Sequence, residues 1–261
     1  LVMVSGMGTI AGSVMGTYIG MLGGTDPAAK VLFATHLLSA SVMAVPGSIV
    51  LAKMLCPQTE EATDHVAISG KEKENSNILD AISSGTVTGV KLMTNIAAML
   101  LVFISLVALA NYITEGVIGR YTGLNDWIVK ITDGKAQGLT FQFILGVITS
   151  PFMWLIGVPS QDIMLVGSLL GQKTILNEFV AYFQLQQWKD AGLFMYEKSI
   201  LMSTYILCGF ANISSIGILL GGLGVLAPEK RGLISRIGVP AMIGGALVSV
   251  LSATIIGMIL G

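Results

Sequence analysis

Long apolar stretches alternate with polar connectors along the chain, and their lengths predict a series of membrane-spanning helices. Six stretches without Asp, Glu, Lys or Arg cover residues 1–25, 31–52, 92–114, 136–161, 199–228 and 237–261. Each is long enough to cross a hydrocarbon core, which needs about 20 helical residues. Between the second and third stretches, residues 56–77 are strongly polar. They predict a solvated loop that leads into an amphipathic helix at 78–89.

The composition narrows the class of protein. Of 261 residues, 53% are hydrophobic and 11% are charged, whereas soluble domains carry about 25% charged residues. We therefore expect an all-α integral membrane protein in contact with the lipid bilayer. The net charge of −1 argues against a basic nucleic-acid-binding protein, so nucleic acid is not an expected partner. Cys56 and Cys208 lie far apart in the sequence, and neither a disulfide framework nor a transition-metal site is predicted.

Two of the apolar stretches are interrupted by small and polar residues, which predicts discontinuous helices. The segments are VSGMGTIAGSVMG at 4–16 and LCGFANISSIGI at 207–218, and an offset of 203 residues places Thr9 over Asn212. The same offset places the apolar residues 34–55 over 237–258. Matched interruptions in two halves of a chain indicate the midplane site of an inverted-repeat transporter. The alternative is close helix packing through small residues, which the matched pair makes less favourable.

A third polar interruption predicts a re-entrant hairpin at 159–185. Its polar centre, around Gln172 and Glu178, divides the segment into halves too short to span the bilayer. The equivalent hairpin of the first repeat would lie upstream of Leu1, and Leu1 opens directly into an apolar stretch without a basic leader. We therefore expect the chain to begin within a longer protein.

Opposite orientation of the two repeats constrains the segments between them. An odd number of crossings is required, and a scaffold helix at about 89–113 supplies one. The apolar residues 139–157 should then lie along the membrane interface. Lys and Arg are too evenly distributed between the predicted faces to fix the absolute orientation.

Glu178 is the strongest candidate for a functional residue. An ionisable side chain at membrane depth is costly and usually marks a substrate or ion pathway. The alternatives are an ion pair with Lys173 or a hairpin tip at headgroup level. Lys173 is itself expected to neutralise Asp162 or to extend toward the headgroups. The segment GSLLGQKT has Gln172 where a phosphate-binding loop needs glycine, so that motif is rejected.

Three segments carry a resemblance to a known family. TIAGSVMG at 9–16, SLLGQKTILNEFVAY at 168–182 and CGFANISSIGI at 208–218 resemble signature stretches of the concentrative nucleoside transporters, which are sodium- or proton-driven carriers. The resemblance extends along the whole chain. It implies two inverted transport repeats, at 1–55 and 139–261, on a scaffold at 56–138 that forms a homotrimer. The second repeat would contain a broken helix at 199–221 and a last helix at 237–260.

The resemblance also implies roles for individual residues. It places Glu178, Asn212 and Ser215 on the ribose hydroxyls of a nucleoside, with Phe210 and Val14 beside the base. A carboxylate and an amide suit vicinal hydroxyls, and desolvated polar groups discriminate strongly against an analogue that lacks one.

The first broken helix is implied to hold part of a sodium site. Thr9 and the Ile10 carbonyl match the half of that site that this helix contributes, and hard cations prefer such oxygen ligands. The other half and a base-reading hairpin would belong to the missing N-terminal segment of the same protein. No other cofactor is implied, and no enzymatic activity.

The favoured function is import of nucleosides by alternating access in a bacterial inner membrane, with sodium preferred over proton as the coupling ion. A carrier of the same architecture for a nucleobase or a carboxylate is the first alternative. An ion channel would need a continuous polar pore, whereas the polar interruptions here are localised. An intramembrane enzyme is least favoured because Glu178 has no acidic partner within its hairpin.

Overall fold

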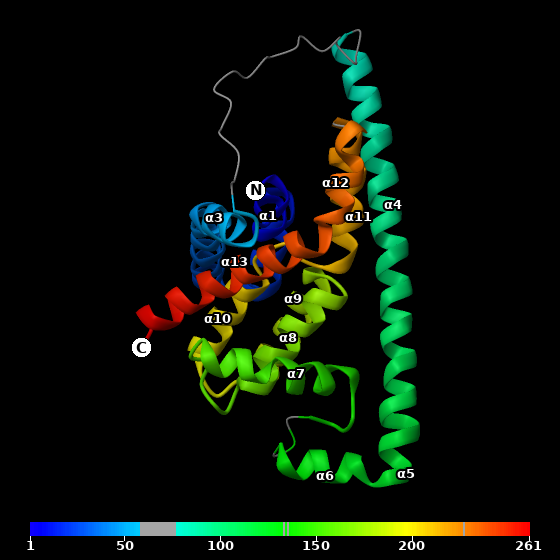
Figure 1. Ribbon diagram of the computed structural model, residues 1–261. Coiled ribbons are helices and arrows are strands. Elements are labelled where there is room, and N and C mark those ends of the chain that lie inside the picture. Colours follow the sequence, from blue (N-terminus) through cyan, green and yellow to red (C-terminus); the bar gives the residue numbers. More distant parts are fainter. Residues whose placement is uncertain (58–76, 133, 135, 227) are drawn as a thin grey trace.

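The computed structural model describes residues 1–57, 77–132, 134, 136–226 and 228–261, and every regular element in these residues is a helix (Figure 1). In chain order the elements are α1 (Val2–Gly8), α2 (Gly12–Gly23), α3 (Pro27–Leu55), α4 (Ile78–Asn111), the π-helix η1 (Tyr112–Gly119), α5 (Arg120–Thr122), α6 (Leu124–Ile131), α7 (Phe141–Leu155), α8 (Ile163–Ile175), α9 (Glu178–Asp190), α10 (Glu197–Leu207), α11 (Ile213–Leu226), the 3-10 turn η2 (Pro228–Lys230), α12 (Arg231–Arg236) and α13 (Gly238–Ile259).

Three helical stretches in the described part of the chain are long and apolar enough to cross a membrane. They are Val2–Gly23, Pro27–Leu55 and Gly238–Ile259. Large apolar side chains remain exposed on their outer surfaces, for example Val42, Val45 and Val50 on α3. A helix satisfies its backbone hydrogen bonds internally, so such apolar surfaces suit contact with lipid.

The first of these stretches is interrupted between α1 and α2. Thr9 follows α1 with extended backbone angles, φ −114° and ψ 158°, and Ala11 precedes α2 with φ −72° and ψ 131°. The interruption lies within the segment that the glycine and polar residues single out. It releases carbonyl groups at the end of α1 from the usual helical hydrogen bonds.

The second interruption separates α10 from α11. Asn212 ends it, because its side-chain oxygen accepts a hydrogen bond from the backbone N–H of Ser215 at 2.9 Å and so caps α11. The two interruptions lie against each other. A methyl group at Gly209 would lie 3.1 Å from the Met7 carbonyl oxygen and 3.2 Å from that of Gly8, so glycine permits this close backbone approach.

Helices α8 and α9 form a hairpin that joins at Leu176 and Asn177. The Asn177 side chain caps α9 by accepting from the N–H of Val180 at 2.9 Å. Helix α7 packs tightly on α8 through glycines: a Cβ at Gly171 would lie 2.6 Å from the Cβ of Leu145, so no larger residue fits without movement. The hairpin and α7 therefore form one packed unit.

One long helix stands beside this unit (Figure 1). The two segments predicted at 78–89 and about 89–113 are a single helix, α4, which continues into η1 and α5. The prediction of a boundary near Gly89 was wrong, because an isolated glycine costs a helix only about 1 kcal/mol. In Figure 1, α7 runs across the direction of α4.

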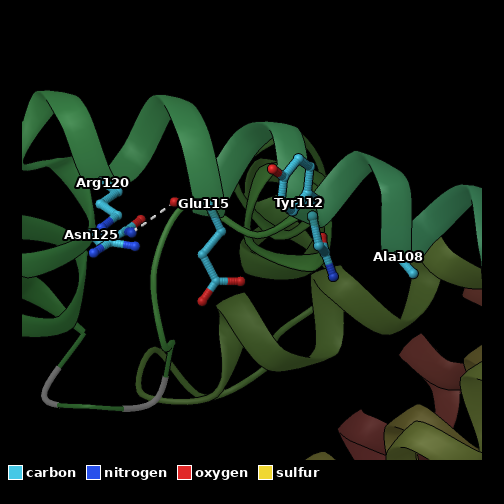
Figure 2. A pocket seen from close by; sticks show the side chains of 7 residues that line it. Ala108, Tyr112, Glu115, Arg120 and Asn125 are labelled. Carbon is cyan, nitrogen blue, oxygen red and sulfur yellow. Dashed lines mark hydrogen bonds between the residues drawn. The ribbon is translucent and has the colours of Figure 1, made fainter.

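Two asparagines join the end of the long helix to the elements that follow. Asn111 accepts from the N–H of Phe141 at 2.7 Å, and Asn125 accepts from the N–H of Leu139 at 3.0 Å. Asn125 also donates to the Glu115 carbonyl at 3.0 Å (Figure 2). The adjoining hollow has a volume of about 390 Å³ and is lined by Ala108, Asn111, Tyr112, Glu115, Gly116, Arg120 and Asn125. It is open and lies on the long helix, away from the two helix interruptions.

Candidate functional site

The hairpin and the second broken helix meet at a buried pair of polar side chains. Asn212 donates from Nδ2 to Oε2 of Glu178 at 3.0 Å, and the two residues are 0% and 6% exposed. The contact joins the first residue of α9 to the residue that caps α11. The amino-terminal ends of two helices therefore converge at this point, and their partial positive charges favour an acidic or oxygen-rich group there.

The amide of Asn212 is held in a fixed orientation by the first turn of α11. Its oxygen accepts from the Ser215 N–H at 2.9 Å, the Ser215 hydroxyl at 2.8 Å and the Ser214 hydroxyl at 2.6 Å. The Ser215 hydroxyl also contacts the Phe210 carbonyl. Because the oxygen of the amide is occupied, its NH₂ group is directed at Glu178.

Tyr18 completes the surroundings of Glu178, although the sequence pattern did not single it out. Its hydroxyl lies close enough to interact with the carboxylate. The ring stacks on Tyr182 with centroids 4.2 Å apart and an interplanar angle of 22°. Tyr182 is fixed in turn by its hydroxyl, which donates to the Thr204 carbonyl at 2.9 Å. The available signal was that Tyr18 lies one helical turn after Val14, a residue already predicted to face the solute.

The structure brings together Glu178, Asn212 and Ser215 as the sequence suggested, while their part in binding stays a prediction. Phe210 lies in the second interruption and is half-buried, and Val14 is half-buried on α2.

Thr9 and Ile10 lie at the other interruption. The Thr9 hydroxyl donates to the Ser5 carbonyl at 3.0 Å, and the Ile10 backbone approaches the Cys208 thiol. Residues of the two helix interruptions therefore lie next to each other.

The expected partners of Lys173 were wrong. Its ammonium donates to the Ile206 carbonyl at 2.8 Å and to the Ser249 hydroxyl at 3.0 Å. Asp162 instead accepts from the backbone N–H groups of Met195 and Tyr196 at 3.0 to 3.2 Å, so it anchors the loop before α10. Within the described residues no salt bridge joins Lys173 to Glu178, which acts on it as a neighbouring charge. Sequence alone could not find these partners, because they lie far along the chain.

A hollow of about 350 Å³ lies beside the tip of the hairpin. Side chains from α4, α7, α8 and α9 form it, and four of them are glutamines: the lining is Val107, Gln142, Gln172, Leu176, Phe179, Val180, Phe183, Gln184 and Gln187. Apolar walls with a few amide groups are typical of sites for small organic solutes. Phe179, which lines this hollow, follows Glu178 directly in the sequence, but Glu178 and Asn212 are not among the lining residues.

The sequence of the chain matches a family model described as Na⁺ dependent nucleoside transporter C-terminus over residues 36–257. The chain belongs to this family. The family comprises nucleoside transporters and not enzymes.

Several relatives are similar over almost the whole chain. An uncharacterized transporter of Haemophilus influenzae is 39% identical over 100% of this chain and 58% of its own length. Sodium/nucleoside cotransporter 1 of Rattus norvegicus is 37% identical over 99% of this chain and 39% of its own length. Nucleoside permease NupC of Helicobacter pylori is 36% identical over 100% of this chain and 57% of its own length. The chain therefore spans 39% to 58% of the length of these relatives.

Solved structures of the transporter CNTnw have the same fold. A variant in an outward-facing state superposes with a TM-score of 0.82 at 35% identity, covering 98% of this chain and 57% of that one. An inward-facing substrate-bound state gives a TM-score of 0.79 at 36% identity, covering 98% and 55%. The fold is thus that of a membrane transporter.

Proposed function

We propose that this chain supplies the C-terminal part of a cation-coupled nucleoside importer. The observation that carries the proposal is the buried hydrogen bond between Glu178 and Asn212, placed where the amino-terminal ends of α9 and α11 converge. A buried carboxylate at membrane depth is costly, so its retention favours a role in binding. The names of the relatives, sodium/nucleoside cotransporter and nucleoside permease, point to a nucleoside as the solute.

Ribose suits this pair chemically. An ionised carboxylate has about four acceptor positions, and Asn212 and Tyr18 occupy two of them, so Glu178 retains acceptors for the hydroxyls of a sugar. The Ser215 hydroxyl lies beside the amide of Asn212 and extends the polar surface. Phe210 and Val14 are half-buried and offer apolar contact to a base. We assign the ribose to Glu178, Asn212 and Ser215, and the base to Phe210 and Val14.

The coupling ion is proposed to be sodium, with Thr9 and Ile10 as ligands from this chain. The residues fit a hard cation, because α1 ends here with carbonyl groups released from helical bonding and has no basic residue in its last turn. Sodium would supply positive charge that organises the unwound backbone. Coupling follows if the organised backbone binds the nucleoside more tightly, since a ligand shifts an equilibrium only through differential affinity.

Transport is proposed to occur by alternating access. The hairpin and the two broken helices would move against the long helix α4, which stands beside α11 (Figure 1). Solved structures of CNTnw in outward-facing, intermediate and inward-facing states support this cycle. In the same proposal the α8–α9 hairpin is re-entrant and the two repeats are inverted. The scaffold forms a homotrimer in a bacterial inner membrane.

Uptake by the full-length protein that contains this chain tests the proposal. Proteoliposomes are loaded without sodium and diluted into labelled uridine with sodium chloride, or with choline chloride as the matched control, over a series of pH values. We expect saturable uptake that requires sodium and is inhibited by unlabelled uridine and adenosine. A nucleobase or a dicarboxylate that inhibits better than both nucleosides would overturn ribose recognition. Uptake that follows the proton gradient without sodium would overturn the choice of ion.

A further inference from the structure

Lys173 is a fully buried cation held by oxygen atoms of the second helix interruption. Its side chain is 0% exposed, and its ammonium donates to the Ile206 carbonyl and the Ser249 hydroxyl. Ser249 donates onward to the Cys208 carbonyl at 3.0 Å. A charged amine away from water is costly unless its surroundings compensate the charge. The Ile206 carbonyl is a backbone oxygen in the last turn of α10, where the helix ends and its carbonyls lack helical partners, and the Ser249 hydroxyl connects the ammonium to the Cys208 carbonyl that follows.

The carboxyl ends of α8 and α10 meet at this amine, and the carboxyl end of α1 lies against the neighbouring Gly209. Lys173 lies in the last turn of α8, and Ile206 lies in the last turn of α10. The carbonyls of Met7 and Gly8, at the end of α1, approach Gly209 beside Ser249. Each helix carries a partial negative charge at its carboxyl end, and a cation is stabilised there. Neither α1 nor α10 has a basic residue in its own last turn, so the hairpin provides the positive charge.

We propose that Lys173 is a tethered cation that does at the second interruption what a free sodium ion does at the first. This inference rests on the proposed function for the role of sodium at Thr9. Its ammonium compensates the Ile206 carbonyl directly and the Cys208 carbonyl through Ser249, and it ties the hairpin to α10 and α13. A neutral residue at position 173 then leaves the Ile206 carbonyl and the Ser249 hydroxyl oxygen, which Lys173 contacts, without a cation. Hard monovalent cations bind such neutral oxygens, so the altered protein needs an additional sodium ion.

The specific consequence is a change in sodium stoichiometry. Lys173→Gln removes the charge but keeps a hydrogen-bonding side chain, Lys173→Arg keeps the charge, and Lys130→Gln removes a charge from the exposed surface of α6. We expect Lys173→Gln alone to raise the Hill coefficient of sodium-dependent uridine uptake by up to about one, because one more ion must bind. The sodium ions carried per nucleoside, measured with labelled sodium, should rise in the same variant.

A second measurement does not depend on transport. The melting temperature of each purified full-length variant is measured in detergent over a range of sodium chloride, with N-methyl-D-glucamine chloride holding the ionic strength constant. An ion that binds the folded protein stabilises it in proportion to the logarithm of its concentration. We expect a steeper rise with sodium for Lys173→Gln than for wild type, Lys173→Arg or Lys130→Gln.

Different experimental results would refute the role of Lys173 and the proposed coupling to sodium. A Lys173→Gln protein whose melting temperature depends on sodium as in wild type, with unchanged stoichiometry, would overturn the tethered cation. So would a Lys173→Gln protein that stays unfolded at every sodium concentration while Lys173→Arg folds, because sodium then does not replace the amine. A wild-type protein that transports nucleosides without sodium would overturn the proposed coupling ion. The melting experiment would still decide the role of Lys173.

Discussion

Replacement of Glu178 by Gln tests the ribose assignment most directly. The variant keeps the size of the side chain and an oxygen that accepts from Asn212, so the buried contact at 3.0 Å is preserved. What it loses is the charge. A hydrogen bond to a charged group contributes about 1.5–3 kcal/mol and a neutral one about 0.5–1.5 kcal/mol, so the expected loss is about 1–2 kcal/mol for one ribose hydroxyl.

That loss corresponds to a KM for uridine about 5- to 30-fold higher, at about 1.4 kcal/mol per tenfold change. The assay is the concentration dependence of uridine uptake by the full-length protein in proteoliposomes, repeated with 2′-deoxyuridine and 3′-deoxyuridine. We expect the wild type to discriminate against at least one deoxynucleoside. The Glu178→Gln variant should discriminate less, because the charged acceptor that recognised the missing hydroxyl is gone. Glu197→Gln is the control, since Glu197 is exposed at the start of α10.

The ribose assignment would be refuted if Glu178→Gln had the same KM for uridine as the wild type and discriminated equally against both deoxynucleosides. A higher KM with the same penalties would show that Glu178 acts on the site through Asn212 or Tyr18 and not on the sugar. The comparison across substrates is therefore the decisive measurement, because it isolates the contact between one protein group and one hydroxyl.

Two further predictions concern the fold. Single cysteines at Thr140 and Leu155, in a protein with Cys56→Ser, should react with an impermeant reagent from one membrane face, because α7 is predicted to lie along the interface; labelling from opposite faces would show that it spans. Gly209→Ala should destabilise the protein by about 1–3 kcal/mol, since the added methyl group would lie 2.5 Å from Ser249 Oγ. Its melting temperature should fall relative to Gly217→Ala, where a methyl group meets nothing within 4 Å, and equal melting temperatures would contradict the close packing of Gly209 against Ser249.

The positions of the helix interruptions were predictable because their causes are local. Glycines and small polar residues stand within apolar stretches around Thr9 and Asn212, and backbone can leave a helix at membrane depth only where it is shielded from lipid. The structure interrupts both helices at these places. The meeting of Glu178 with Asn212 followed from expecting two discontinuous elements to converge.

Contacts between distant residues were less accessible from the sequence. Lys173 was expected to pair with a nearby acid, but its partners Ile206 and Ser249 lie 33 and 76 residues away, and no charge marks either one. A carbonyl oxygen gives no signal in the sequence. Tyr18 was overlooked for a similar reason, since an aromatic residue in an apolar helix is usually a packing residue and its approach to Glu178 depends on the tertiary fold.

The glycine contacts between α7 and α8 would couple any movement of the hairpin to a movement of α7. A Cβ at Gly146 would lie 2.8 Å from the Met164 carbonyl oxygen, and Gly167 and Gly171 are approached as closely by Thr149 and Leu145, so the two helices have little room to slide. If the hairpin shifts as proposed, α7 must move together with it. In the proposed transport cycle, the drag of the surrounding lipid on α7 would then help to set the rate of the hairpin's movement.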